Sequence, residues 1–220
     1  MSKIVPTKPL LIMLYGYPGS GKSYVARQLS TNIQAAHVQG ERIRNELFES
    51  PRYDKQENDV VAQLMDYMAQ EFLGAGMSII YDTNALRSAQ RHTLREMARK
   101  AHAQPLVVWL QIDIESAFQR TQRRDRRKAD DRYSTSMDRS MFDNVLSYMQ
   151  NPSSIEDYVV ISGKHVFNTQ LSAIVKKLND MNLLSVEDIN SKIAKPELVN
   201  LVPNPNSGRV DMKRRNIIIR

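Results

Sequence analysis

The sequence predicts an α/β protein in which a mostly parallel, five-stranded sheet lies between two layers of helices. Short apolar runs suited to buried strands alternate with amphipathic segments suited to helices, as in repeated strand–helix units. Apolar residues make up 41% of the 220-residue chain and charged residues 25%, a balance that supports a folded core. A glycine-rich turn also joins the first predicted strand directly to the first predicted helix.

Two strand–helix units come first. Leu10–Tyr15 is an uninterrupted apolar run, which favours a strand buried on both faces. Residues 24–33 carry apolar side chains at helical spacing and predict a helix. Residues 35–39 form a second short strand-like run, and residues 41–49 predict a helix that ends before Pro51.

Two further units follow in the same order. Residues 58–75 carry apolar side chains every three or four positions, and Gly74 closes this predicted amphipathic helix. Residues 77–81 predict a third buried strand and residues 87–103 a helix. A fourth strand is expected at residues 106–112.

The last elements are less regularly spaced. A helix at residues 114–124 leads into a basic stretch, and a second helix at 137–150 stops before Pro152. Residues 158–161 predict the fifth strand and residues 169–182 the last helix. We therefore expect residues 1–182 to form one domain.

Residues 183–220 differ in composition and are expected to form a C-terminal appendage. A small helix at residues 186–193 and a hairpin that pairs residues 198–202 with 216–219 are possible forms. A flexible basic tail fits the composition equally well.

Composition excludes several classes of function. The chain has no cysteine, so it can form no disulfide framework, thiolate zinc site or cysteine nucleophile. The apolar run before Gly16, Leu10–Tyr15, has only six residues, too few for the apolar region of a signal peptide or for a bilayer span. We therefore expect a cytoplasmic protein with no membrane partner. The four histidines show no metal-ligand spacing and are interpreted as structural or exposed.

Positive charge favours anionic partners. The net charge is +7, which attracts nucleotides or nucleic acid. Residues 120–132 hold seven Lys/Arg against three Asp, and residues 209–220 hold five against one. Both segments could contact phosphate, although an ordinary solvated face explains the second equally well.

The glycine-rich turn fits the P-loop pattern G-x-x-x-x-G-K-[ST] in full, from Gly16 to Ser23. Backbone N–H groups in such a loop surround phosphate, and the helix that follows adds partial positive charge. Lys22 should bridge the β- and γ-phosphates of ATP, and Ser23 should ligate Mg²⁺. A dinucleotide site is disfavoured because the glycine spacing is wrong. The residues expected to contact ATP here are Gly16, Pro18, Gly19, Ser20, Gly21, Lys22, Ser23 and Tyr24.

Acidic residues follow the second and third predicted strands, where ligands collect in open α/β sheets. Glu41 and Arg44 lie one helical turn apart, so they could serve as general base and phosphate ligand or simply form an intrahelical ion pair. Asp82 is expected to hold a Mg²⁺ water or Arg44. An Asx turn or helix N-cap at Asp82-Thr-Asn is the alternative.

The segments QGERIRNEL and IIYDTN and the arginine-rich stretch after the fourth strand resemble the kinase domain of phage polynucleotide kinase and the related zeta-toxin group. The resemblance spans roughly residues 10–180. It implies that Glu41 is the general base and that Arg44 is the phosphate ligand. Polynucleotide kinases have Asp at the position that corresponds to Glu41. It also implies an arginine-rich lid over ATP, with Arg120 and Arg124 as the expected contacts.

Arginines 120, 123, 124, 126 and 127 all lie within eight positions. Because Arg120 and Arg124 are four residues apart, a helix would place both on one face, where they could stabilise charge developing on phosphate. A solvated basic helix would explain only some of these arginines.

Three functions remain open at this stage. The first is transfer of the γ-phosphate of ATP to the 5′-hydroxyl of a polynucleotide, and the second is transfer to a nucleoside, sugar or nucleotide-sugar. The third is an ATP-dependent module in which Arg214, Arg215 and the tail bind nucleic acid without transfer. ATP is preferred to GTP because no Asn-Lys-x-Asp signature is present.

Overall fold

The computed structural model describes residues 3–125, 127, 131–134 and 137–185. In this part of the chain, one sheet has five strands in the order β2-β3-β1-β4-β5. Every neighbouring pair is parallel, which confirms the predicted sheet. The strands are β1 (Leu10–Tyr15), β2 (Ala35–Gln39), β3 (Ser78–Asn84), β4 (Gln104–Gln111) and β5 (Tyr158–Ser162).

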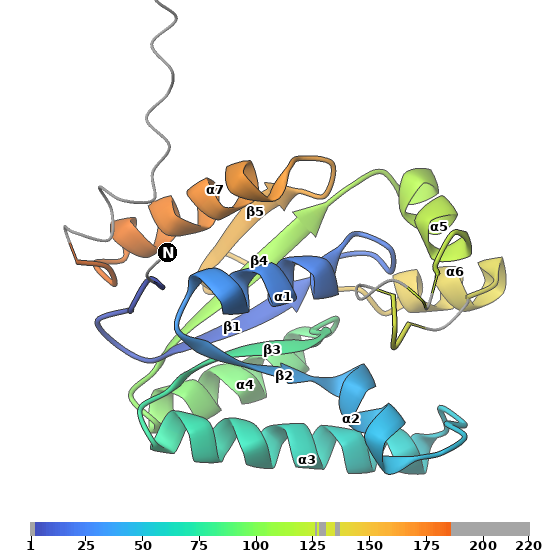
Figure 1. Cartoon of the computed structure of the whole chain (residues 1–220), viewed down its shortest axis with the longest axis horizontal. Coiled ribbons are helices and arrows are strands. Elements are labelled where there is room, and N and C mark those ends of the chain that lie inside the picture. The colour runs from blue at the N-terminus through green and yellow to red at the C-terminus, as the bar shows by residue number, and fades with distance from the viewer. Residues whose placement is uncertain (1–2, 126, 128–130, 135–136, 186–220) are drawn as a thin grey trace, which may run out of the picture.

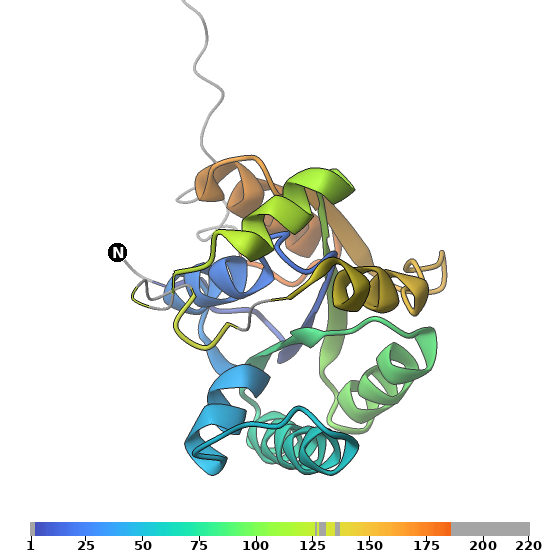
Figure 2. The same cartoon turned by 90° about the vertical axis from the view of Figure 1, so that its right-hand side faces the viewer.

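Helices cover both faces of this sheet, so the predicted three-layer α/β/α architecture is confirmed (Figure 1). Helices α1 and α7 cover one face, and α3 and α4 cover the other. Helices α2, α5 and α6 lie at the edge where the strands end (Figure 2). The helices are α1 (Lys22–Asn32), α2 (Gly40–Leu47), α3 (Lys55–Gly74), α4 (Ser88–Lys100), α5 (Ile114–Gln122), α6 (Arg139–Ser147) and α7 (Phe167–Asp180).

Strand β1 lies between two apolar clusters and contributes side chains to both. Its alternate residues Leu10, Ile12 and Leu14 point toward α1 and α7, whereas Leu11 and Met13 point toward α3 and α4. All six residues of β1 are at most 1% exposed. The prediction that this continuous apolar run forms a strand buried on both faces is therefore confirmed.

Two elements differ from the sequence prediction in ways that affect the site. Strand β3 continues to Asn84, because Asp82 pairs with Gln39 of β2 and Asn84 pairs with Leu14 of β1. The alternative Asx turn or N-cap at Asp82 is therefore wrong, and α4 begins only at Ser88. Helix α5 ends at Gln122. The prediction that Arg120 and Arg124 share a helix is therefore wrong.

The core continues a little beyond residue 182. Leu183 and Leu184 are buried in the cluster that holds α1 and α7, and the Leu183 carbonyl accepts a hydrogen bond from Thr7 N–H. The helix and hairpin considered for the appendage lie outside the described residues. Among the described helices, none is both long and apolar enough to cross a bilayer.

Candidate active site

The turn between β1 and α1 forms a phosphate cradle at the end of the central strand. Gly19 and Gly21 adopt φ angles of 80° and 99°, which L side chains rarely tolerate. A Cβ on Gly19 would also overlap the Ala117 carbonyl of α5, so the loop packs directly against that helix. The side chain of Lys22 folds back over the loop, and its Nζ donates to the carbonyls of Gly16 and Tyr17, each at 2.8 Å.

The start of α1 and the end of β3 place two oxygen ligands side by side. Ser23 Oγ donates to Asp82 Oδ1 at 3.1 Å, and His37 Nε2 lies 2.9 Å from Asp82 Oδ2. Mg²⁺ in phosphate-transfer sites takes one or two protein oxygens together with phosphates and water. The hydroxyl and the carboxylate fit this requirement, so Ser23 and Asp82 are the residues that would hold the ion.

The pKa of Lys22, the lysine of the cradle, is lowered by burial. Desolvation is the main cause that lowers the pKa of Lys22 to about 7, and the positive charge of Arg124 lowers it further. The carboxylate of Asp82 acts in the opposite direction. A bound triphosphate would add to the negative charge of Asp82 and would thereby favour the protonated lysine.

Glu41 lies in the first turn of α2 and interacts electrostatically with Asp82 and Arg124. Burial raises the pKa of its carboxyl group, while Arg44, Tyr53 and Arg124 counteract part of the rise. Its Oε2 atom is shielded from solvent and has no hydrogen-bond partner among the described residues. A carboxylate in this state accepts a proton more readily than an ordinary glutamate does, as a general base requires.

Arg44 is placed differently from what the phosphate-ligand hypothesis requires. It is 5% exposed, and its guanidinium donates to Glu57 Oε2 at 3.3 Å and to Asn58 Oδ1 at 2.6 Å. The ring of Tyr53 covers it at 4.6 Å, and Glu41 Oε2 lies 3.8 Å from Nε. In this arrangement Arg44 ties α2 to α3 and stands behind Glu41. Its proposed contact with acceptor phosphate stays a prediction.

A cavity of about 540 Å³ opens beside the cradle. Arg120 and Arg124 both line it, although they come from different parts of the segment. Arg120 donates to the Gly163 carbonyl at 2.9 Å, and burial is the main cause that lowers the pKa of Arg124. The cradle residues that line the cavity are Pro18, Gly19, Ser20, Gly21, Lys22, Ser23 and Tyr24. Gly16 lies on the other side of the loop.

Sequence reasoning missed two parts of this site. Gly163 and Lys164, in the turn after β5, line the cavity, and Gly163 lies against the Ser20 carbonyl. His37 was interpreted as structural or exposed, and it contacts the predicted metal ligand Asp82. Position after the end of a strand was the available signal for Gly163 and Lys164, since β5 ends at Ser162. His37 lies in the middle of β2 and had no such signal.

The sheet order and the cradle define a P-loop protein with the fold of P-loop kinases. The chain belongs to the AAA_33 family, described as "AAA domain", whose model matches residues 11–152. No curated protein sequence matches the chain.

Solved structures share the fold at low sequence identity. A putative kinase from Chloroflexus aurantiacus has a TM-score of 0.61 at 13% identity, and the match covers 79% of this chain and 97% of that one. A gluconokinase from Sinorhizobium meliloti has a TM-score of 0.55 at 16% identity and coverages of 79% and 93%. The APS kinase CysC from Mycobacterium tuberculosis, in complex with AMPPNP and APS, has a TM-score of 0.55 at 17% identity, with coverages of 79% and 99%.

Proposed function

We propose that the protein transfers the γ-phosphate of ATP to a hydroxyl acceptor, with Mg²⁺, and that the acceptor is the 5′-hydroxyl of a polynucleotide. One observation carries the transfer reaction: the Glu41 carboxylate, whose pKa is raised, shares electrostatic partners with the cradle lysine Lys22. Glu41 interacts electrostatically with both Asp82 and Arg124, and Lys22 interacts with the same two residues. These shared interactions support a single reaction centre that involves all four groups.

Each residue has a defined task in this reaction. The cradle N–H groups and Lys22 hold the β- and γ-phosphates, while Arg124 stabilises charge on the transferred group. The acceptor O–H attacks the γ-phosphorus, the bond from phosphorus to the β–γ bridging oxygen breaks, and ADP leaves with that oxygen. The hydroxyl proton passes to the Glu41 carboxylate. Mg²⁺ held by Ser23 and Asp82 would neutralise phosphate charge.

The polynucleotide acceptor is supported by the resemblance of residues 39–47 and 79–84 to polynucleotide kinases and by the net charge of +7. A small hydroxylated acceptor is the second candidate. Arg44 favours it, because this guanidinium is already held by Glu57 and Asn58 instead of being directed at an acceptor phosphate. The gluconokinase and the APS kinase that share the fold are also kinases named for small molecules.

Incubation with γ-labelled ATP tests both acceptors, using 5′-hydroxyl RNA and DNA oligonucleotides and, separately, a panel of nucleosides and sugars. Label on the oligonucleotide supports the first proposal, and label only on a small molecule selects the second. Glu41→Gln should slow transfer by about 10²- to 10⁴-fold while ATP binding persists. The matched control is Glu46→Gln, an exposed carboxylate on the same helix, and it should leave transfer unchanged.

A different result would contradict transfer altogether. Hydrolysis of ATP without label on any acceptor, at the same rate in Glu41→Gln, indicates an ATP-dependent binding module. Lys22→Ala should abolish ATP binding or turnover, and full activity in this variant would remove the cradle assignment.

A further inference from the structure

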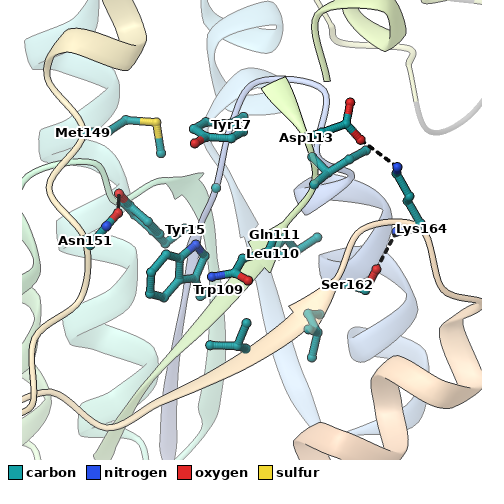
Figure 3. A pocket seen from close by; sticks show the side chains of 14 residues that line it. Tyr15, Tyr17, Trp109, Leu110, Gln111, Asp113, Met149, Asn151, Ser162 and Lys164 are labelled. Atoms are coloured by element: carbon teal, nitrogen blue, oxygen red, sulfur yellow. Dashed lines mark hydrogen bonds and ion pairs between the residues drawn. The ribbon is translucent and has the colours of Figure 1, made fainter. Parts of the chain in front are cut away.

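A second cavity of about 630 Å³ lies on the other side of the P-loop from the phosphate cavity. The two cavities share only Lys164 among the residues that line them. This one opens over the ends of β1, β4 and β5, beside the segment that follows α6 (Figure 3). Its volume is within the range of about 300–1,000 Å³ for small-molecule sites. The reaction proposed above uses none of its side chains.

Aromatic side chains line one end of this cavity. Trp109 packs edge-on against Tyr15, with ring centroids 5.5 Å apart, and against Tyr158 at 6.0 Å. Figure 3 shows Trp109 and Tyr15 on one side of the opening and Met149 and Tyr17 on the other. Rings and a thioether arranged in this way suit a flat, polarisable ligand.

Buried polar contacts fix the wall in place. Tyr15 is 1% exposed, and its hydroxyl donates to Asn151 Oδ1 at 2.9 Å. Arg91 is fully buried, lies 5.3 Å from the Tyr15 ring centroid and donates to the Asn151 carbonyl at 3.3 Å. Glu156 holds the Arg91 guanidinium at 2.9 Å. The wall is therefore formed before any ligand arrives, which reduces the entropic cost of binding.

Charge excludes ionic ligands. Among the described residues that line the cavity, Asp113 and Lys164 alone are charged, and they pair with each other at 2.6 Å. The cavity therefore offers no uncompensated cation to a phosphate and no uncompensated carboxylate to an ammonium group. Gln111 and Asn151 contribute carboxamides, and within the described chain the Gln111 side chain has no hydrogen-bond partner. Carboxamides pair well with the polar edges of heterocycles.

We propose that this cavity binds a nucleobase, stacked between Trp109 and Tyr17 with its edge toward Gln111. The base can belong to a free nucleoside or to an oligonucleotide, since the recognised group is the same. Stacking of bases on aromatic side chains is a recurrent source of affinity in nucleic-acid binding. The site is distinct from the phosphate cavity: Tyr17 belongs to the P-loop but lines only this second cavity, and the ligand does not need Glu41.

Trp109 is the only tryptophan of the chain, so its fluorescence and its single indole N–H signal in NMR report directly on this cavity. The experiment titrates the full-length protein with uncharged nucleosides and with a 5′-hydroxyl oligonucleotide. Both titrations are repeated with saturating magnesium tripolyphosphate, which occupies the cradle without supplying a base. We expect saturable quenching and a shifted indole signal, unchanged by tripolyphosphate.

Val160→Lys adds a long, charged side chain at a position that is 42% exposed on the cavity rim. It should weaken nucleoside binding by about tenfold or more, the equivalent of losing one stacked base. The control is Val166→Lys, which is 72% exposed and lies outside both cavities, and it should bind as the wild type does. The indole signal of the wild type needs no variant and tests the site even if Val160→Lys misfolds.

Three outcomes would overturn the proposal. They are an indole signal that no nucleoside or oligonucleotide shifts, equal binding in Val160→Lys and the wild type, or saturable binding of tetramethylammonium or a sugar in place of nucleosides. The proposed transfer function fails separately, through the absence of labelled product.

Discussion

Gly163→Ala should damage the phosphate cradle although Gly163 lies far outside the P-loop motif. A Cβ at this position would lie 2.7 Å from the Ser20 carbonyl oxygen, and ordinary van der Waals contact begins at 3.4 Å. To bring the Cβ and the Ser20 carbonyl oxygen from 2.7 Å to 3.4 Å, the cradle or the β5–α7 turn must move by about 0.7 Å. The cavity residues Gln111 and Ile112 are each 3.5 Å from the same Cβ, so the turn has little room to retreat.

Overpacking of this kind costs about 1–3 kcal/mol. If the cradle absorbs the shift, its N–H groups no longer converge on phosphate, and the affinity for ATP with Mg²⁺ should fall by about 5- to 150-fold. Isothermal titration calorimetry measures the affinity, and a thermal melt reports how much of the cost falls on stability.

Gly74→Ala is the matched control, because a Cβ at Gly74 meets no atom within 4 Å. This variant should bind ATP with unchanged affinity and melt no lower than the wild type. If Gly163→Ala also binds ATP and melts like the wild type, the close approach of the β5–α7 turn to the cradle is refuted.

The other predictions concern protonation and one buried ion pair. Because the pKa of Lys22 is lowered to about 7, the side chain is charged at about pH 6 and largely neutral at about pH 8.5. ATP binding should therefore take up a proton at the higher pH, measurable by calorimetry in buffers of different ionisation enthalpy, and absence of uptake would contradict the buried lysine. Burial raises the pKa of Glu41, so the rate of transfer should fall with decreasing pH above the ordinary range of glutamate, and a pH–rate profile without this limb would argue against Glu41 as the base. Arg91→Met should cost about 3–5 kcal/mol in urea unfolding, because it leaves the Glu156 carboxylate buried without its partner. Arg99→Met, an exposed position on the same helix, should cost little. Burial alone would raise the pKa of Glu156, but Arg91 and the Ser153 N–H more than offset it, so the net pKa is lowered. The stabilisation is present above the unfolded-state pKa and is lost as pH falls through the folded-state value, and a flat acid titration of stability would contradict it.

Local patterns predicted the centre of this protein well. The apolar run Leu10–Tyr15 predicted both ends of β1 correctly. A strand that is buried on both faces consists of consecutive apolar residues, so its bounds can be recognised without knowing which strands pair with it. The P-loop spacing likewise located the cradle, since the turn geometry depends on glycines within eight residues. In both cases the structural constraint acts on neighbours in sequence.

Contacts between distant residues could not be predicted in the same way. The sequence Asp82-Thr-Asn favours a turn locally, yet pairing with β1 and β2 extends β3 through it. Arg44 is held by Glu57 and Asn58, which lie on another helix, and no periodicity relates the three positions. The contact between Gly163 and Ser20 depends on how β5 ends beside the cradle, which only the assembled sheet determines.

The central position of β1 has a consequence for how the protein opens. Strand β5 is at the sheet edge and exposes Val160, so its amides can exchange with solvent through local fluctuations. Amides of β1 are hydrogen-bonded on both sides within two apolar layers, and their exchange should require global unfolding. A ligand that binds the loop carried by β1 should consequently slow the exchange of the slowest amides, and raise the melting temperature of the whole domain with its concentration.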